Sequence, residues 1–489
     1  MGRAQKGNDG LGHHGADQAA TLNQAIALME RSGEPEAASV LCRRLLARAP
    51  DFLPARIVLA AALLAAGEAA SALAAAEAAL ALDPACAPAL FVRGTALSLL
   101  RRPAEAVAAL ARAAAGAPSH AGTWLNLGIA FTTLDRYEEA EAAIGRALAL
   151  EPEAAGAWAS LGALRVQQLR IGEALAAYDA SVRLAPANPC FQHDRALTLL
   201  RAGDFAAGWE GLRWRKPEEA RALATIGVRG PEWDGREVAE RTLLLCATQG
   251  LGDAIQFARY VRLLARAGGR AVLCCHETLH RLLASLEGVG AIVVPGDPLP
   301  PHDSWASLGS LPRIFGTTGS TIPEAHFYLA ADPGRAAAWR AELGSGPVIG
   351  LAWAGNPAHV NDARRSMPAA FLAPLLAVPG IRFASLQRGA DPAALGPGVI
   401  DLAPRLTDLA EAAAALAALD LVVTVDTALA HLAGALGRPA WVALPYAPDW
   451  RWQLGRPDSP WYASLRLFRQ PRPGDWASVI AAIAANLAA

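Results

Sequence analysis

The sequence predicts a protein of mixed α and α/β class, in which an N-terminal α-solenoid of stacked helix pairs precedes two α/β domains with parallel sheets. Three observations carry this prediction. Prolines recur every 34 residues in the first part, the composition changes after Arg215, and short β-rich runs then alternate with helical stretches. A chain of 489 residues is also too long for a single hydrophobic core, so several domains are expected.

The proline period marks a structural repeat. The spacing of 34 is kept by five prolines, Pro50, Pro84, Pro118, Pro152 and Pro186. The best-preserved unit, TWLNLGIAFTTLDRYEEAEAAIGRALALEPEA, has small residues where two helices would cross closely and a proline where the second helix would end. It resembles the tetratricopeptide repeat, a helix–turn–helix unit of this length. We count five good repeats over residues 18–186.

The repeat array sets the first boundaries. Residues 1–18 read as a disordered tail, 19–215 as the solenoid and 216–240 as a linker rich in turn signals. A degraded helix pair at 187–215 is expected to cap the stack and to dock it to the α/β domains. Stacked repeats form a concave surface that typically binds a protein or peptide. A structural spacer or a dimerisation arm stays open as an alternative.

The second part alternates strands and helices. We expect strands at the runs TLLLCA, AVLCCH, AIVVPG, SWASLGSL, PVIGLAWAG, RFASLQ, VIDLA, LVVTVDT and AWVALP. We expect helices around residues 253–267, 277–288, 368–378, 406–418 and 427–437. This alternation predicts right-handed crossovers and parallel sheets, hence two Rossmann-like domains at 241–340 and 341–489. Ligands of such sheets bind at the carboxyl ends of the strands, which places a site between the two domains.

Charge and composition limit the partners. A net charge of −1 argues against a nucleic-acid partner, and no run of the chain is expected to form a transmembrane segment. The first residues lack the apolar core of a signal peptide. The six cysteines form no CxxC pair, so buried reduced thiols and a cytoplasmic location are expected.

The turn TQGLGDAIQF, at residues 248–257, is the first candidate for chemistry. Gly250 and Gly252 would permit a tight turn between a strand and a helix. Asp253 comes next, at the start of that helix. It is either a helix-capping residue or a general base that removes a proton from an incoming hydroxyl.

The segment VVTVDTALAHLAGALGRP, at residues 422–439, is the second candidate. A buried strand ends at Asp426 and Thr427, and a helix of small residues begins at Ala428. The free N–H groups of its first turn suit a diphosphate. His431, on the same helix, is a further candidate for donor binding. Asp426 or Thr427 could instead only cap the helix, and His431 could only pack on its inner face.

The loop AWAGNPAHVNDARRSMP, at residues 352–368, is the third candidate, because it is dense in polar groups and comes after a buried strand. Arginine there would neutralise phosphate charge. The polar residues of the loop are Asn356, His359, Asn361, Asp362, Arg364, Arg365 and Ser366. Of these, Asn356, Arg365 and Ser366 are candidates for binding the donor and its phosphates. A solvated loop is the alternative, and the histidines show no metal-ligand spacing, so no metal site is expected.

The segment 446–471 combines aromatic residues with arginines. Trp450, Trp452, Trp461 and Tyr462 could stack on a base or sugar, or could pack at a domain interface. The sequence does not favour one of these over the other.

Together these motifs resemble the family 9 glycosyltransferases of the heptosyltransferase type, which have a GT-B fold, in the branch fused to tetratricopeptide repeats. The turn GLGD matches the family's glycine–aspartate turn, which implies that Asp253 is the catalytic base. The segment VDTALAHLAGALGRP matches the donor-site motif. It implies that Asp426, Thr427, Ala428 and the N–H groups beyond them hold the diphosphate of the activated sugar.

The chain departs from the family in the loop at 352–368. Arg365 and Met367 stand where the family has a phosphate-binding lysine and a tryptophan. The positive charge is kept, but the sugar and nucleotide known for heptosyltransferases do not carry over. The acid that contacts the donor ribose has no secure match, and Gln387 and Asp391 are weak candidates.

The resemblance implies a metal-independent and inverting transfer with no resident cofactor. A nucleotide-sugar is the expected donor, and a polypeptide on the concave face of the repeats, such as a flagellin-like protein, is the expected acceptor. Two alternatives stay open: a non-catalytic scaffold with a degenerate nucleotide-binding domain, and a transferase for lipopolysaccharide or another glycan.

Overall fold

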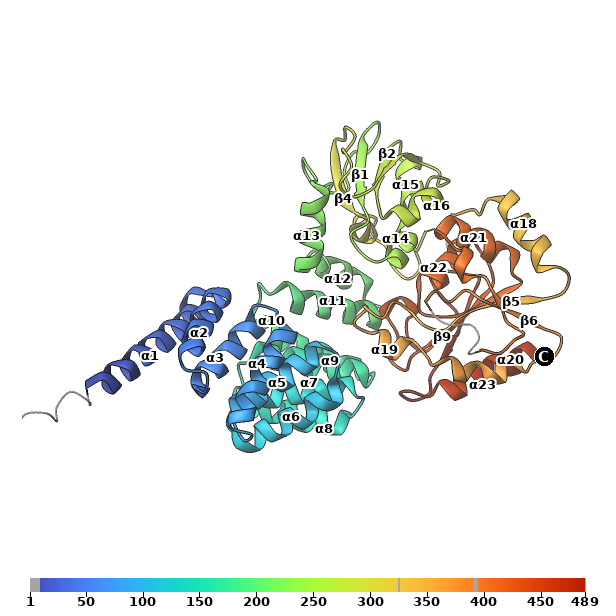
Figure 1. The fold of residues 1–489 in the computed structure, drawn as a ribbon. Coiled ribbons are helices and arrows are strands. Elements are labelled where there is room, and N and C mark those ends of the chain that lie inside the picture. Colours follow the sequence, from blue (N-terminus) through green and yellow to red (C-terminus); the bar gives the residue numbers. More distant parts are fainter. Residues whose placement is uncertain (1–8, 324–325, 390–394, 489) are drawn as a thin grey trace, which may run out of the picture. The chain divides into compact units, whose positions relative to one another are not determined.

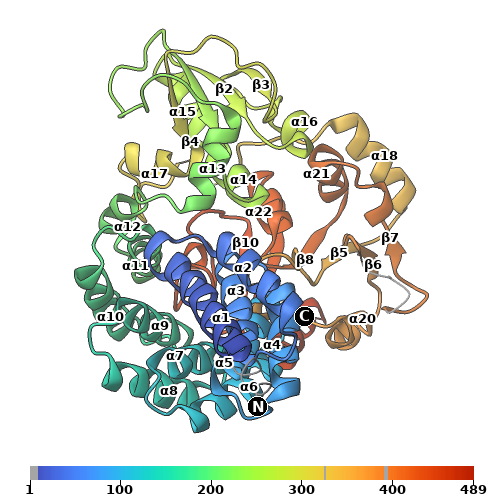
Figure 2. The same cartoon turned by 60° about the vertical axis from the view of Figure 1, so that its left-hand side comes forward.

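A computed structural model describes residues 9–323, 326–389 and 395–488 of the chain (Figures 1 and 2). The chain separates into two compact units with the boundary between Ala185 and Pro186. Asp391, a weak candidate for donor binding, lies outside the described residues, as do residues 1–8 of the expected tail. Residues 9–18 of that tail are helical, because helix α1 begins at Asp9.

The first unit is an array of helix pairs. After α1 (Asp9–Ala27) and a π-helical turn (Leu28–Ser32), helices succeed one another in antiparallel pairs through residue 184. They are α2 (Pro35–Arg48), α3 (Leu53–Ala65), α4 (Ala69–Leu82), α5 (Ala87–Leu99), α6 (Pro103–Gly116), α7 (Ala121–Thr133), α8 (Tyr137–Leu150), α9 (Ala155–Gln167) and α10 (Ile171–Leu184). The predicted solenoid of five repeats is confirmed within residues 9–185.

A glycine in the first helix of three successive repeats explains the close packing within each pair. A Cβ atom added to Gly94 would lie 2.5 Å from Leu110 Cγ, and one added to Gly128 would lie 2.5 Å from Ile144 Cγ1. Gly162 stands in the same relation to Tyr178, at 2.9 Å. Both members of each contact recur every 34 residues, so the sequence period is a period of helix–helix contacts.

The second unit begins with the degraded pair, α11 (Pro189–Ala202) and α12 (Phe205–Gly211). These helices pack on the α/β part: the Trp209 ring lies 5.2 Å from that of Trp450, and Arg201 donates to the Pro448 carbonyl at 2.9 Å. The expected linker at 216–240 contains a further helix, α13 (Pro217–Ile226). Segment 186–240 is therefore part of the α/β unit, because the Trp209 ring is buried against the apolar core of that unit.

Two parallel sheets form the rest of the second unit. The first sheet has the order β3-β2-β1-β4 and the second the order β10-β9-β8-β5-β6-β7. The strands of the first are β1 (Thr242–Cys246), β2 (Arg270–Cys274), β3 (Val289–Val293) and β4 (Ser304–Ser307). Those of the second are β5 (Val348–Ala352), β6 (Arg382–Ser385), β7 (Ile400–Asp401), β8 (Leu421–Val425), β9 (Ala440–Leu444) and β10 (Leu465–Arg469). Every expected strand is present, and β10 is an addition.

Helices connect successive strands, as parallel pairing requires. They are α14 (Leu251–Ala258), α15 (Tyr260–Arg266), α16 (His280–Leu283), α17 (Leu311–Ile314), α18 (Pro333–Leu343), α19 (Asp362–Arg365), α20 (Ala373–Leu376), α21 (Leu409–Ala418), α22 (Ala428–Ala435) and α23 (Trp476–Ala488). Short 3-10 turns lie at Glu277–Leu279, Leu308–Ser310, Ala369–Leu372, Ala403–Arg405 and Trp450–Trp452. The order of the second sheet is that of a dinucleotide-binding sheet, with its switch point between β5 and β8.

A buried arginine joins the two sheets' domains. Arg259, between α14 and α15, is fully buried and donates to the carbonyl of Trp461 at 2.9 Å. Its guanidinium also lies 4.8 Å from the ring centres of Tyr328 and Tyr462. Of the two alternatives for the aromatic segment, the structure shows interface packing, since all four of its candidate rings are buried and unavailable to a base or sugar.

Candidate functional site

Two helix starts meet where the carboxyl ends of the sheets face each other. Helix α14 comes after β1 in the first sheet, and α22 after β8 in the second; Figures 1 and 2 show the two helices side by side. The closest approach is at Gly252, where an added Cβ would lie 2.8 Å from His431 Cδ2 and 3.6 Å from Ala428 Cα. A side chain at position 252 would push the helices apart.

Neither glycine of the turn has a backbone conformation that requires glycine, and Gly252 serves close packing between the helices. Gly250 has φ −66° and ψ 164°, an extended conformation open to any residue, and Gly252 is not among the glycines with positive φ. We expected both glycines to permit the turn through their greater backbone freedom, and this explanation is wrong, because neither has a positive φ. For Gly252 the requirement comes from α22, about 180 residues further along the chain.

Asp253 occupies the third position of α14 and has two partners. One carboxylate oxygen accepts the N–H of Gly250 at 3.0 Å, which caps the helix. The other pairs with the guanidinium of Arg451, from the turn at Trp450–Trp452. The capping interaction expected for an acid at this position is present, and the side chain keeps 25% of its surface exposed.

Arg451 is the centre of a small charge cluster that links the two sheets. It also donates to Asp449 at 2.8 Å and to the side-chain oxygen of Gln256 at 2.5 Å. Burial opposes ionisation of Asp449, but the adjacent Arg451 guanidinium outweighs it and holds the pKa of this carboxyl below its ordinary value. Sequence reasoning missed Arg451 and Asp449, because the surrounding aromatic residues indicated stacking and no motif marks the pair.

Asp426 and Thr427 directly precede α22. Loss of hydration and the neighbouring carboxylate of Asp449 raise the pKa of Asp426 to about 6. Thr427 is the N-cap residue, but its hydroxyl lies 3.2 Å from that of Thr424 and caps no N–H group. Within the described residues the N–H groups of Ala428 and Leu429 have no hydrogen-bond acceptor, and no acid stands in the first turn of α22. This helix start remains open to an anion.

His431 lies inside the protein. Its Nδ1 atom is 3.0 Å from the hydroxyl of Tyr462, and its ring stacks on Trp452 at 5.4 Å. Burial, and then the charge of Arg451, lowers the pKa of His431 to about 3, so the imidazole is neutral at physiological pH. These contacts show that the His431 side chain packs against Tyr462 and Trp452 inside the protein.

The loop after β5 brings one cation to the start of α22. Arg365 donates to the backbone carbonyl of Asp426 at 3.1 Å and to Asp362 at 3.3 Å, with 15% of its side chain exposed. Met367, by contrast, is buried in the core. Arg365 and the open N–H groups of α22 therefore lie together.

The other polar residues of the loop shape it. The Ser366 hydroxyl accepts the N–H of Gly355 at 2.8 Å, and Asn356 accepts the N–H of Ala358 at 3.0 Å. Gln387, after β6, accepts the N–H groups of Trp353 and Ala354 at 3.0 and 2.8 Å. Ser366, Asn356 and Gln387 thus hold the loop in place, and each has at least one polar atom engaged in that role.

Comparisons with known proteins agree with this architecture. Residues 388–449 match the model of glycosyltransferase family 9 (heptosyltransferase), a segment that contains β8 and α22. Residues 121–153, helices α7 and α8, match the tetratricopeptide repeat. The two matches fit a fusion of a tetratricopeptide-repeat array with a family 9 glycosyltransferase domain.

A curated relative is similar to a large part of the chain. It is Protein FlbA of Caulobacter vibrioides, 29% identical over 346 residues, which cover 63% of this chain and 57% of that protein. The chain thus spans little more than half the length of this relative.

Solved structures resemble the repeat part. The tetratricopeptide-repeat protein TTC0263 of Thermus thermophilus is 26% identical, with a TM-score of 0.34, over 37% of this chain and 99% of that one. The type IV pilus biogenesis factor PilW is 21% identical, with a TM-score of 0.37, over 43% and 94% of the two chains.

Neither a metal-ion cluster nor a membrane-spanning helix is found among the described residues. No group of three or more His, Cys, Asp or Glu side chains there is arranged to hold a metal ion. None of the helices in that part of the chain combines the length and the apolar character that a membrane crossing needs. All six cysteines are free thiols, and five of them are buried.

Proposed function

We propose that this fusion protein transfers a sugar from a nucleotide-sugar donor to a hydroxyl group of a polypeptide acceptor. The observation that supports the proposal is the meeting of α14 and α22, in which Asp253 of one domain comes close to the uncapped helix start of the other. Two Rossmann-like domains with the site between them form the GT-B arrangement. The repeat array supports a polypeptide as acceptor, because such arrays bind protein segments.

In this proposal the donor diphosphate lies at the start of α22. The N–H groups of Ala428 and Leu429 and the guanidinium of Arg365 stabilise its negative charge, which increases as the glycosidic bond to phosphate breaks. The neutralising charge then comes from the protein, so the transfer requires neither a metal ion nor a resident cofactor.

Asp253 serves as the general base. Its carboxylate accepts the proton of the acceptor hydroxyl as the oxygen attacks the anomeric carbon from the face opposite the diphosphate, which inverts the configuration. Arg451 and the N–H of Gly250 orient the carboxylate from two sides. The free thiols favour a reducing compartment, so we place the reaction in the cytoplasm, before any export of the acceptor.

A transfer screen over nucleotide-sugars, with a lysate-derived acceptor pool and radiolabelled sugar, tests the proposal. Asp253→Asn should lower the transfer rate by about 100-fold or more while the affinity for nucleoside diphosphates stays within about twofold. Glu237→Gln, on a side chain that is 88% exposed, is the matched control and should transfer at the wild-type rate. Unchanged turnover by Asp253→Asn would remove Asp253 from the mechanism.

One observation favours a second function. Arg451 already occupies one oxygen of the Asp253 carboxylate, as expected if the pair only holds two domains together in a non-catalytic scaffold. In that case nucleoside diphosphates can still bind, but the screen detects no transfer with any donor, and Asp253→Asn changes stability alone. Transfer by the wild-type protein excludes the scaffold.

A further inference from the structure

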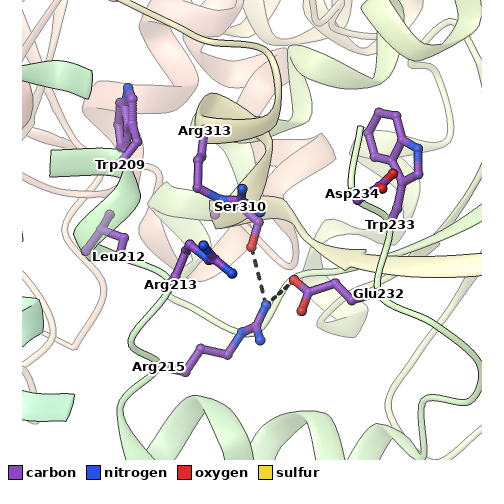
Figure 3. A pocket seen from close by; sticks show the side chains of 10 residues that line it. Trp209, Leu212, Arg213, Arg215, Glu232, Trp233, Asp234, Ser310 and Arg313 are labelled. Carbon is purple, nitrogen blue, oxygen red and sulfur yellow. Dashed lines mark hydrogen bonds and ion pairs between the residues drawn. The ribbon is translucent and has the colours of Figure 1, made fainter. Parts of the chain in front are cut away.

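A cavity of about 380 Å³ lies in the second unit, apart from the start of α22 (Figure 3). Segment 186–240 supplies most of its lining, and the residues after β4 supply the rest. The lining includes Trp209, Arg213, Arg215, Glu232, Trp233, Asp234, Ser310 and Arg313. This volume is in the range of pockets that bind small molecules or a few side chains.

The cavity lies on the sheet edge that presents Asp253. The hydroxyl groups of Thr248, before the turn, and Ser307, at the end of β4, are 3.2 Å apart. Both also hydrogen bond to Glu219 of α13, at 3.1 and 2.9 Å. Gln249 and Gly309, which follow Thr248 and Ser307 closely in the chain, are also near each other, since a Cβ on Gly309 would lie 2.9 Å from the side chain of Gln249. The cavity wall is thus continuous with the turn that carries Asp253.

The cavity has an excess of positive charge. Arg213 pairs with Glu210 at 2.6 Å, and Arg215 pairs with Glu232 and lies 3.5 Å from the Ser310 hydroxyl (Figure 3). Within the part of the chain that the structure describes, Arg313 has no carboxylate partner. The cavity therefore offers one uncompensated guanidinium.

The aromatic side chains that line the cavity add apolar surface but no free hydrogen-bond donors. The indole N–H of Trp209 donates to the carbonyl of Thr317 at 2.7 Å, and that of Trp233 donates to the carbonyl of Arg236 at 2.8 Å. Both donors are thus used inside the protein. A ligand in the cavity meets apolar rings and the arginine side chains.

We propose that this cavity binds an acidic side chain, aspartate or glutamate, of the acceptor polypeptide close to the hydroxyl that receives the sugar. The inference rests on the proposed function, because it takes Asp253 as the base. A single carboxylate matches the single unpaired guanidinium. A phosphate with two charges fits less well, since it would face the carboxylates of Glu232 and Asp234 in the same cavity.

Peptide binding to the full-length protein tests this assignment. The probes are acetylated hexapeptides with one serine and one aspartate, with the aspartate at each of the three positions on either side, and the matching asparagine peptides. Isothermal titration calorimetry should give about tenfold tighter binding for at least one aspartate peptide than for its asparagine match. Inorganic phosphate should compete more weakly than that peptide.

Three variants make the test specific. Arg313→Gln should abolish the preference for aspartate, and Arg221→Gln, on a side chain 74% exposed on α13, should keep it. Asp234→Asn should strengthen binding of the aspartate peptide about threefold, because it removes a like charge and keeps the side-chain oxygen that accepts the N–H of Arg236. This opposite sign keeps the test decisive if Arg313→Gln folds poorly.

The outcomes separate the cavity from the proposed function. Equal affinities for aspartate and asparagine peptides, a preference that survives Arg313→Gln, or stronger competition by phosphate would each overturn the acidic-peptide site. In that event nucleoside diphosphate binding and sugar transfer by the wild-type protein still support the proposed function. Peptide selectivity without any nucleotide binding or transfer would instead overturn the proposed function and leave a peptide-binding cavity.

Discussion

Each of the two compact units of this protein is stabilised by internal contacts of a different kind. In the repeat unit, Gly128 meets Ile144 within one helix pair, and the same contact recurs 34 residues earlier and later. In the α/β unit, Asp253 meets Arg451 and Gly252 meets His431, about 200 and 180 residues apart, and neither contact recurs. A repeat contact depends on local spacing, whereas the contacts at the candidate site exist only when two domains have folded and met.

Arg451→Met should have the largest effect and should break the α/β unit selectively. Asp253 and Asp449 would lose their shared cation; their side chains are partly buried, 25% and 32% exposed, so we expect a cost of about 3 kcal/mol, at the lower end for a broken buried pair. Urea unfolding monitored by tryptophan fluorescence measures this loss, since Trp450 adjoins Arg451. Arg472→Met, on a side chain 81% exposed, should lower stability by less than about 0.5 kcal/mol.

The double variant Arg451→Met with Asp253→Asn sharpens this prediction. Removing the orphaned charge should recover part of the lost stability, about 1 kcal/mol or more. A loss below about 1 kcal/mol in the single variant, or no recovery in the double one, would mean that the ion pair contributes little to the contact between the domains.

The difference between the units explains how far the sequence could predict the fold. The five helix pairs and nine of the ten strands are indicated by local patterns, the 34-residue period and short apolar runs between helical stretches. Local patterns do not indicate where the solenoid ends, because Trp209 packs against Trp450, a residue that no local pattern joins to it. Segment 186–240 has weak repeat and turn signals of its own, and only its burial against the α/β core shows where it belongs.

The candidate site also has one part that the sequence predicts and another that it does not. Asp426, Thr427 and the helix after them are indicated by a strand that ends in a polar pair before small residues. The sequence does not indicate the role of Gly252, because its neighbour in space is His431 of another domain. Arg451 was missed for the same reason: in the sequence it is one arginine among tryptophans, and its partners are Asp449 and the distant Asp253.

Gly252→Ala should have the next largest effect. The added methyl group would overlap with His431 and force α14 away from α22, at a cost of about 2 kcal/mol and with loss of sugar transfer. Gly128→Ala should destabilise the repeat unit by a similar amount, because its Cβ would lie 2.5 Å from Ile144. Thermal unfolding followed by circular dichroism measures both.

Gly145→Ala is the matched control for these two variants. Gly145 lies within α8 and an added Cβ would meet no atom within 4 Å, so alanine should raise stability by about 0.5–1 kcal/mol. The same gain for Gly252→Ala would show that α14 and α22 are not in close contact in solution.

A pH series separates two groups at the start of α22. The raised pKa of Asp426, about 6 against 3.8, adds stability that is complete below pH 3.8 and is lost as pH rises to 6. The lowered pKa of His431, about 3 against 6.5, adds stability that is complete above pH 6.5 and is lost as pH falls. Between about pH 4 and 6 the two contributions have opposite slopes and largely cancel in the wild-type protein.

Single variants should therefore diverge from the wild type in opposite directions. As pH falls from about 6 to 4, Asp426→Asn should lose about 1 kcal/mol per pH unit relative to wild type, and His431→Gln should gain about as much. Urea midpoints at four pH values across and just above this window give both slopes. Parallel curves for a variant and the wild type would show that the substituted group has the same pKa in the folded and unfolded chain.

The smallest effect lies in the repeat unit and tests how strictly its period applies. The turn between the paired helices holds a residue with positive φ every 34 positions, Gly67, Arg101, Asp135 and Leu169. Glycine adopts this conformation without strain, whereas leucine at φ 58° does not. Leu169→Gly should therefore stabilise the array by about 0.5–1 kcal/mol, measured by urea unfolding.

Leu169→Ala is the informative control, because alanine keeps the Cβ atom and with it the strain of positive φ, so its stability should stay near that of the wild type. A gain for glycine without a gain for alanine would assign the effect to the backbone. Destabilisation by both would show that the partly buried leucine side chain contributes more to this turn than its strained backbone costs, and that the repeats tolerate positive φ where a packing contact offsets it.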